Sequence, residues 1–507
     1  MRRNSLRAGR RDAGATSILT LANPGVLLLA AHFGASLMLA AYGLHRLHLA
    51  LRYLRHVRRR PAGEIPARSR LPSVTVQIPL YNERYVAERA VLAAGELDYP
   101  PDRLEIQVLD DSTDETCEVV ARVVQLLSTR GVHAVHIRRA HRTGYKAGAL
   151  AEGLRRASGE LIAIFDADFV PQPDFLLRVV GEFGDPSVGL VQARWGHLNG
   201  ATSLLTRVQA LQLDAHFTVE HGARAATGCF LNFNGTAGVW RREAIEAGGG
   251  WSADTLTEDL DLSYRAQLAG WRFVYRDDVA VPAELPVEVA AYRMQQQRWA
   301  QGGVRTAVKL LPSIARSGIP GRTKREAFWH LTGHFTYPVF VALALTSLGA
   351  GWLMEPLHKS WVLAADGALL AFAGLALAVF YGVAARARGG AGWWRRLVLV
   401  PIIMVLGAGI ALGQTAAVAR GLARRPTPFR RTPKYRLGSV PDASWRSTAY
   451  RLVTARSALL ECAIGVAVLA ASVAAVLSNA ASPTGSAIMC GLGFASVGGG
   501  SLLQQRP

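Results

Sequence analysis

Residues 161–168 read Leu-Ile-Ala-Ile-Phe-Asp-Ala-Asp, a continuous apolar run that ends in two carboxylates. The run predicts a buried β-strand. Taken alone, an Asp-x-Asp pattern is more often a turn or a helix cap than a metal site. Carboxylates are costly to bury, however, unless a cation or hydrogen-bond donors satisfy them. Directly after a buried strand, Asp166 and Asp168 are candidate oxygen ligands of Mg²⁺ or Mn²⁺, shared with substrate phosphates.

The segments around this run alternate between strand and helix patterns. Strands are expected at 73–80, 104–109 and 134–137, and helices at 83–96, 114–129 and 146–157. Ser112 and Glu115 have the spacing of a capping box at the start of the second helix. The alternation indicates an α/β domain with a mostly parallel sheet and helices on both faces.

Acidic residues recur at the predicted strand ends. Asp110 and Asp111 directly follow the strand at 104–109. Because ligands of such sheets bind at the carboxyl ends of the strands, we expect these residues near Asp166 and Asp168. The repeated pattern weakens the interpretation of Asp-x-Asp as a simple turn.

A third acidic segment is Thr257-Glu-Asp-Leu-Asp261, which precedes a helical pattern over 260–269. Asp259 is a candidate general base, with Thr257 or Asp261 capping or orienting the helix. The alternative is an ordinary helix N-terminus, where the helix dipole favours acidic residues. This segment alone favours the alternative.

Gln295, Arg298 and Trp299 lie at i, i+3 and i+4 of a helical pattern that starts near Val287, so they share one helix face. An Arg suits a leaving diphosphate, and an indole suits stacking on a sugar ring. The alternative is an amphipathic helix on a bilayer surface with Trp as its anchor. The two interpretations are compatible.

The chain also carries apolar segments of membrane-spanning length. Half of its 507 residues are hydrophobic, and its net charge is +20. Apolar runs lie at 24–44, 329–354, 361–383, 396–417, 457–478 and 484–503. About 20 apolar residues cross a bilayer. The Arg-rich segments 45–60 and 418–455 flank these runs, which predicts a cytosolic location and argues against nucleic acid as the partner.

Three apolar runs separate the α/β domain from the basic loop 418–455. If all three crossed the bilayer, the loop would lie on the side opposite to the α/β domain. One of the three is therefore expected to lie along the interface or to re-enter. The four cysteines form no CxxC pair and predict neither a disulfide framework nor a zinc site.

These patterns divide the chain into eight segments. They are a basic tail (1–23), a transmembrane helix (24–44), a basic juxtamembrane helix (45–70), the α/β domain (71–285), interfacial helices (286–328), transmembrane or interfacial helices (329–417), a basic cytosolic loop (418–455) and C-terminal transmembrane helices (456–507).

The order Asp, Asp-x-Asp, Thr-Glu-Asp and Gln-x-x-Arg-Trp resembles the family 2 inverting glycosyltransferases, and the last motif resembles their processive cellulose, hyaluronan and mannan synthases. Over about residues 70–440 the chain is similar to the cellulose-synthase-like A and C proteins, which are glucomannan 4-β-mannosyltransferases and glucan synthases. The segments that carry this similarity are 77–83, 109–114, 146–150, 233–236 and 431–434.

The resemblance implies a GT-A-type domain between membrane helices, and a role for each matching residue. The nucleotide would contact Asp110 and Asp111 near Tyr81 and Glu83, with Lys146 at a phosphate. Asp166 would face the ribose and phosphate, Asp168 the metal, and Asp259 the acceptor hydroxyl. Gln295 and Arg298 would hold the diphosphate, and Trp299 would form the floor of the acceptor site. The segment 431–434 resembles a gate over the nucleotide, although a basic loop on the membrane surface is equally favoured.

The implied activity is inverting transfer of a hexose from GDP-mannose or UDP-glucose to a β-linked polysaccharide or oligosaccharide, at the cytosolic face of a bilayer. The Ala-, Arg- and Gly-rich composition favours a bacterial inner membrane over a Golgi one. One alternative is single addition to a polyprenyl phosphate or lipid, against which Gln-x-x-Arg-Trp argues. Another is an inactive membrane protein, against which Asp166, Asp168 and Asp259 argue. Linkage, acceptor, accessory subunits and oligomeric state stay open.

Overall fold

The computed structural model describes residues 24–56, 67, 70–353, 359–424, 429, 431–438, 450, 452, 455–477 and 484–505. A sheet of seven strands forms the centre of the α/β domain, in the order β3-β2-β1-β4-β6-β5-β7. The strands are β1 (Val74–Leu80), β2 (Leu104–Asp110), β3 (Ala134–Arg138), β4 (Leu161–Ile164), β5 (Val188–His197), β6 (Gly238–Arg241) and β7 (Arg272–Ala283). Strand β6 pairs antiparallel with β4 and β5, and the other pairs are parallel. The predicted mostly parallel α/β sheet is confirmed.

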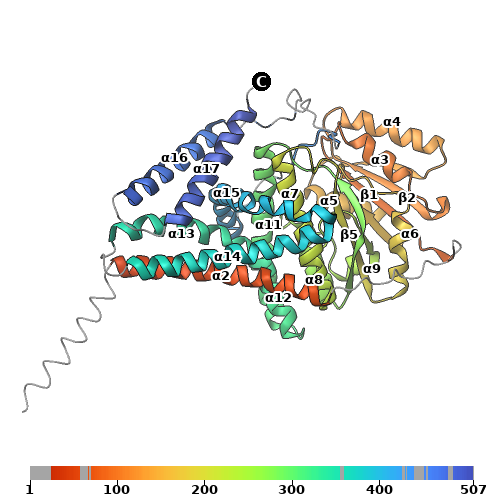
Figure 1. Ribbon diagram of the computed structural model, residues 1–507. Helices are drawn as coiled ribbons and strands as arrows, with labels where there is room; N and C mark the ends of the chain where they lie inside the picture. Colours follow the sequence, from red (N-terminus) through yellow and green to blue (C-terminus); the bar gives the residue numbers. More distant parts are fainter. Residues whose placement is uncertain are drawn as a thin grey trace, which may run out of the picture.

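Helices cover both faces of this sheet and form two apolar cores. On one face α3 (Ala87–Gly95) packs on β1 and β2, α4 (Thr116–Thr129) on β3, and α6 (Phe175–Val180) on β7. On the other face lie α5 (Tyr145–Arg156), α9 (Arg242–Ala247) and α10 (Glu258–Leu268). Figure 1 shows the two layers on either side of the strands. Burial of apolar side chains on both faces supplies the main stabilising free energy of such a layered domain.

Polar residues inside β1 and β2 are buried in pairs. The Gln77 amide donates to Gln107 at 3.0 Å, and the Thr75 hydroxyl donates to Glu105 at 2.7 Å. The alternation of apolar and polar residues in β1 therefore does not mark a solvent-exposed face. The polar side chains satisfy one another across neighbouring strands, which removes most of the cost of burying them.

The predicted capping box at Ser112 and Glu115 is wrong. Helix α4 begins at Thr116, and its first turn is capped by the Asp114 carboxylate, which accepts from the Thr116 backbone N–H at 3.0 Å. The Ser112 hydroxyl instead accepts from the backbone N–H of Asn82 at 2.8 Å. The Ser112 side chain, which its sequence spacing assigned to the cap of α4, therefore binds the loop after β1 instead.

Long helices extend from the sheet domain on one side. They are α2 (Pro24–His56), α13 (Thr336–Leu353), α14 (Lys359–Arg388), α15 (Leu399–Leu422), α16 (Ala455–Leu477) and α17 (Thr484–Gln504). In Figure 1, α2 and α14 run side by side away from the sheet, and α16 and α17 form a second pair. Among the described residues, five helices are long and apolar enough to cross a membrane: Pro24–His56, Ala364–Arg388, Gly390–Leu422, Arg456–Leu477 and Gly485–Gln504. The predicted basic tail 1–23, residues 57–66 of the predicted juxtamembrane helix 45–70, and residues 425–428 and 439–449 of the predicted basic loop 418–455 lie outside the described residues.

Helix α11 (Val289–Arg316) lies between the sheet domain and the long helices, and α12 (Gly321–Thr332) packs on α11 and projects at the lower edge of the view (Figure 1). Helix α15 packs along α11 and α17. Its first residue, Leu399, packs with Val208 and Leu211 of α7 (Leu204–Asp214), and Gly421 near its end lies against Val304 of α11. Both ends of α15 therefore contact elements on the sheet-domain side.

Candidate active site

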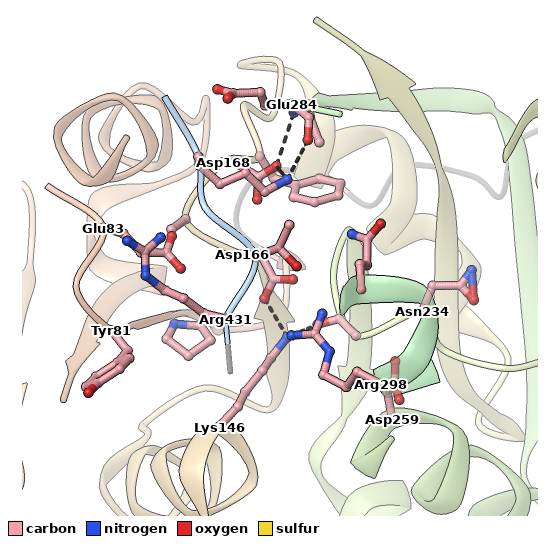
Figure 2. A pocket seen from close by; sticks show the side chains of 18 of the residues that line it. Tyr81, Glu83, Lys146, Asp166, Asp168, Asn234, Asp259, Glu284, Arg298 and Arg431 are labelled. Carbon is pink, nitrogen blue, oxygen red and sulfur yellow. Dashed lines mark hydrogen bonds and ion pairs between the residues drawn. The ribbon is translucent and has the colours of Figure 1, made fainter. Parts of the chain in front are cut away.

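A cavity of about 180 Å³ opens where the carboxyl ends of β1 and β4 meet the starts of α10 and α11. Its charged and aromatic lining comes from segments that are far apart in the sequence (Figure 2). These residues are Tyr81, Glu83, Asp111, Arg142, Lys146, Asp166, Asp168, Glu258, Asp259, Glu284, Gln295, Arg298, Trp299, Phe429, Arg431 and Lys434. Every sequence-predicted site residue except Asp110 lines this one cavity.

The Asp-x-Asp pair follows β4, with Asp168 buried and Asp166 about a third exposed. The ammonium group of Lys146 contacts Asp166. Lys434 donates to Asp168 Oδ2 at 2.7 Å, and the backbone N–H of Glu284 donates to the same oxygen at 3.1 Å. Both carboxylates are thereby held by cationic or N–H donors in the protein.

The donor set at Asp166 and Asp168 fits a hard divalent cation that shares its coordination with phosphate. Within the described ranges no group of three or more His, Cys, Asp or Glu side chains forms an all-protein cage. Mg²⁺ and Mn²⁺ are commonly held by one or two carboxylates together with substrate phosphates. The two aspartates could hold such an ion only with oxygens from a ligand.

Asp259 lies in the first turn of α10 and points into the cavity (Figure 2). Burial and the neighbouring Glu258 carboxylate together raise its pKa to about 7, and Lys146 opposes both effects. Gly235, at φ +81°, packs so closely that a Cβ there would lie 3.0 Å from Asp259 Oδ2. A carboxylate with this pKa can accept a proton near neutral pH.

The residues next to Asp259 take structural roles. Thr257 makes no side-chain cap to α10, and its hydroxyl lies 3.2 Å from that of Thr306 in α11. Asp261 is fully buried and forms ion pairs with Arg265 at 2.7 Å and with Lys309 of α11 at 2.8 Å. Thr257 and Asp261 therefore join α10 to α11, and the capping role expected for Thr257 is not observed.

Gln295, Arg298 and Trp299 share one face of α11, as their spacing predicts, and all three line the cavity. Burial lowers the pKa of Arg298, while Glu258, Asp166 and Asp259 oppose that shift. The guanidinium carbon lies 4.8 Å from the centre of the Phe429 ring. Figure 2 shows Arg298 between Lys146 and Asp259, where two cations face a group of carboxylates.

The opposite end of the cavity combines aromatic and charged groups. The Arg142 guanidinium lies 3.3 Å from the centre of the Tyr81 ring, and Arg139 holds Asp111 through both carboxylate oxygens. Burial raises the pKa of Glu83 to about 7, with Arg431 opposing. A planar ring can stack on Tyr81, and polar edges can be met by Asp111.

Asp110 differs from the sequence expectation. Its side chain is buried, accepts from the Ser112 backbone N–H at 2.9 Å and lies 2.9 Å from His136 Nε2. It does not line the cavity. Side chains alternate between the two faces of a strand, so Asp110 and Asp111 point in different directions, and only Asp111 reaches the cavity.

The segment 431–438 crosses the cavity, and Arg431, Thr432 and Lys434 contribute to its lining. Glu284, at the end of β7, holds this segment by accepting from the backbone N–H of Tyr435 at 2.7 Å and of Leu437 at 3.0 Å. Glu284 and Arg142 also line the cavity and are not among the site residues predicted from the sequence. The position of Glu284 directly after an apolar strand pattern is a signal that could have found it.

Two further cavities continue from the side of Asp259 toward the long helices. The first, of about 380 Å³, shares Trp195, Asn234, Asp259, Gln295 and Trp299 with the charged cavity. The second, of about 320 Å³, shares Arg46, Gln212, Glu220, Tyr337 and Tyr381 with the first and lies between α2, α13, α14 and α15. The lining residues therefore connect Asp259 with the space between the apolar helices.

Comparison with known proteins agrees with this geometry. Residues 72–302 match the family model described as Glycosyltransferase like family 2. The chain is 46% identical over 266 residues to glucomannan 4-beta-mannosyltransferase 2 of Arabidopsis thaliana, which covers 52% of this chain and 49% of that protein. It is 48% identical over 258 residues to a probable glucomannan 4-beta-mannosyltransferase 7 of Oryza sativa subsp. japonica, covering 50% and 44%. The chain thus spans about half the length of these curated relatives. Both are plant proteins and lend no support to the expected bacterial membrane.

A solved structure shares the fold. A mannosyltransferase from Pyrobaculum calidifontis, in complex with GDP-Man and Mn²⁺, superposes with a TM-score of 0.52 at 24% identity, over 79% of this chain and 99% of that one. The expected GT-A-like fold, with apolar helices flanking the domain, is confirmed.

Proposed function

We propose that this chain, whose residues 72–302 match the Glycosyltransferase like family 2 model, transfers mannose from GDP-mannose to the end of a growing β-linked polysaccharide at a membrane. One observation carries the proposal: Asp168, Asp259 and Arg298 come from three distant segments and line a single cavity. The glucomannan mannosyltransferases among the relatives support mannose over glucose as the transferred sugar.

The charges in the cavity suit a single displacement at the anomeric carbon of the donor. Asp259, with its pKa near 7, takes the proton of the acceptor hydroxyl as that oxygen attacks. Arg298 and Lys146 face the charge that develops on the leaving diphosphate. A divalent cation, when bound at Asp166 and Asp168, supplies further neutralisation of that diphosphate. One displacement inverts the α-linked donor to a β-linkage.

The surroundings of Tyr81 suit the nucleobase. Tyr81 offers a stacking face, and Asp111 is fixed by Arg139 so that its carboxylate can accept from base or ribose donors. Trp299 lines both the charged cavity and the adjoining one, and its indole suits the terminal sugar of the acceptor. The donor and acceptor sites therefore meet beside Asp259.

The two adjoining cavities support a polymer as the product. They extend from Trp299 to the space between α2, α13, α14 and α15, which gives an elongating chain a place to go. Aromatic residues along this path, among them Tyr292, Tyr337 and Tyr381, suit contact with sugar rings. This extended path favours chain elongation over single addition to a lipid.

We also propose that α14 crosses the bilayer together with α13, which is not among the five helices named above, and that α15, although long and apolar enough to cross, does not. Both ends of α15 pack on the sheet-domain side, at Val208 and at Val304. After two crossings the chain is again on the side of the bilayer where the sheet domain lies. From that side Lys434 can contact Asp168. This arrangement places the sheet domain and the basic loop together on the cytosolic side, as the Arg-rich segments require.

A donor screen tests the proposal. The full chain in nanodiscs is incubated with radiolabelled GDP-mannose or UDP-glucose, each with Mn²⁺ or Mg²⁺, and products are sized before and after digestion with an endo-β-mannanase. We expect a long, mannanase-sensitive product from GDP-mannose that requires the cation. A product that carries one sugar in the lipid extract, or no transfer from either donor, would overturn the proposal.

A further inference from the structure

Four polar side chains meet inside the bundle of apolar helices, far from the sheet domain. His32 and Ser36 belong to α2, Thr346 to α13 and Asp366 to α14. His32 Nε2 lies 3.0 Å from Asp366 Oδ1, and His32 Nδ1 lies 3.2 Å from the Thr346 hydroxyl. Ser36 donates to the same Asp366 oxygen at 3.4 Å. His32 is fully buried, and Asp366 is 3% exposed.

The three helices bring this cluster to one depth. His32, Thr346 and Asp366 each lie about two turns from the end of their helix that is remote from the sheet domain. The opposite end of α14 contacts the sheet domain, where Arg388 donates to Thr218 at 2.8 Å. The cluster therefore lies toward the far side of the bundle (Figure 1).

The cluster also borders the path from the catalytic cavity. Ser36 lines the cavity between α2, α13, α14 and α15 at the end opposite Arg46 and Glu220. Between these two polar ends the lining is mostly apolar, with Leu39, Leu343 and Leu370 among it. The His32–Asp366 pair thus lies directly behind the Ser36 hydroxyl, which lines the path.

Ionisable residues inside a membrane are expensive and most often line a substrate path or pair with one another. A pair that served only to hold helices together could be replaced by apolar residues of similar size with little loss of stability. A hydroxyl-rich polymer that leaves an apolar passage needs hydrogen-bond partners before it reaches water. The cluster offers carboxylate, imidazole and hydroxyl groups at that point.

We propose that His32, Ser36 and Asp366 form an exit site that binds the hydroxyl groups of a β-linked hexose chain as it leaves the membrane. This inference rests on the proposed function. The incoming hydroxyls exchange with the hydrogen bonds that the cluster makes within itself, Ser36 first because it faces the path. The site acts on the export of the polymer and has no part in sugar transfer at Asp259.

Proteoliposomes test the exit site with the full chain. The sheet domain faces outward, labelled donor is added outside, and polymer that has crossed the bilayer is protected from endo-glycanase added outside. Four proteins are compared: the unaltered chain, His32→Leu with Asp366→Leu, Ser36→Ala, and Ser472→Ala as control. Ser472 is a buried serine of α16 whose hydroxyl donates to the Val468 carbonyl at 2.8 Å, within its own helix.

We expect the double variant to keep its thermal stability and its initial rate of sugar transfer, while the protected polymer falls roughly tenfold, the effect of losing a few hydrogen bonds to the polymer. Ser36→Ala should lower export less, and Ser472→Ala should not change it. Equal export by the double variant and the unaltered chain overturns the exit site. If the double variant does not fold, equal export by Ser36→Ala overturns it instead. An unaltered chain that makes no polymer overturns the proposed function first.

Discussion

Lys434 Nζ lies 2.7 Å from Asp168 Oδ2, although 266 residues separate them in the chain. This contact joins the segment after α15 to the carboxylate that follows β4. Glu284 fixes the same segment through the backbone of Tyr435 and Leu437. The charged cavity is therefore completed by a part of the chain that lies beyond α13, α14 and α15 in the sequence.

The first prediction concerns cation binding. An ammonium group and a divalent cation compete for the same Asp168 oxygen, so Lys434→Met should lower the cation concentration that gives half-maximal donor hydrolysis several-fold. Titration of Mn²⁺ against hydrolysis of the donor without acceptor measures this. Lys324→Met is the control, because Lys324 donates to the Ala315 carbonyl, outside the cavity. An unchanged or higher half-maximal concentration in Lys434→Met would contradict the predicted competition.

The second prediction concerns the general base. Asp259→Asn should reduce sugar transfer by about 10²–10⁴-fold, because the amide cannot accept the acceptor proton. The pKa of this carboxyl is raised in the folded state. The folded state therefore loses stability as the pH rises from the pKa of the unfolded chain to the pKa of the folded one. The variant should therefore unfold at a higher temperature than the unaltered chain at pH 8, and the gap should shrink toward pH 4. Full transfer activity in Asp259→Asn would remove this residue from the mechanism.

The third prediction uses the pH profile. Glu258 raises the pKa of Asp259 because two neighbouring carboxylates repel each other when both are charged. Glu258→Gln removes that repulsion, so the acid limb of the rate profile should move from about pH 7 to lower pH. The rate of transfer at saturating donor, measured from pH 5 to 9, shows the displacement. A limb that stays in place would mean that another group controls it.

The fourth prediction concerns the contact between α10 and α11. A Cβ at Gly302 would lie 2.6 Å from Thr257 Cγ2, so the turn before Asp259 must shift in Gly302→Ala. We expect a fall in the rate constant of transfer of at least tenfold with little change in donor binding, because small displacements of reacting groups are costly. Gly374→Ala in α14 is the control, since a Cβ there meets nothing within 4 Å. Equal rates for the two variants would show that α10 does not depend on this contact.

The fifth prediction concerns topology. In a chain without its native cysteines, Gly438→Cys and Arg155→Cys should react with a membrane-impermeant thiol reagent from the same side. Gly438 is the exposed last residue of the segment 431–438, and Arg155 lies on the outer surface of α5 with a side chain that is 76% exposed. If Gly438→Cys reacted only from the side of the bilayer opposite to the side that labels Arg155→Cys, the proposed crossings by α13 and α14 would be contradicted.

Local sequence was sufficient for the first four strands of the sheet, whereas β5, β6 and β7 were not predicted. Strand and helix patterns placed β1 to β4 within about a residue, because their apolar runs are buried whatever their neighbours are. The three side chains Gln295, Arg298 and Trp299 were placed on one face of α11 because helical geometry alone fixes that relation. The family resemblance then indicated which of these side chains share a site.

The tertiary structure decided what depends on contacts between distant segments. Asp110 and Asp111 are adjacent in sequence, yet only packing shows that Asp110 turns to His136 and Asp111 to the cavity. Competition for hydrogen bonds removed the predicted capping box, because Asn82 binds Ser112. The sequence favoured a membrane surface and the nucleotide cavity equally for the segment 431–434, since a basic stretch suits both. Local periodicity reports only neighbours within a few residues, whereas Lys434 and Asp168 meet because the whole bundle folds back onto the sheet.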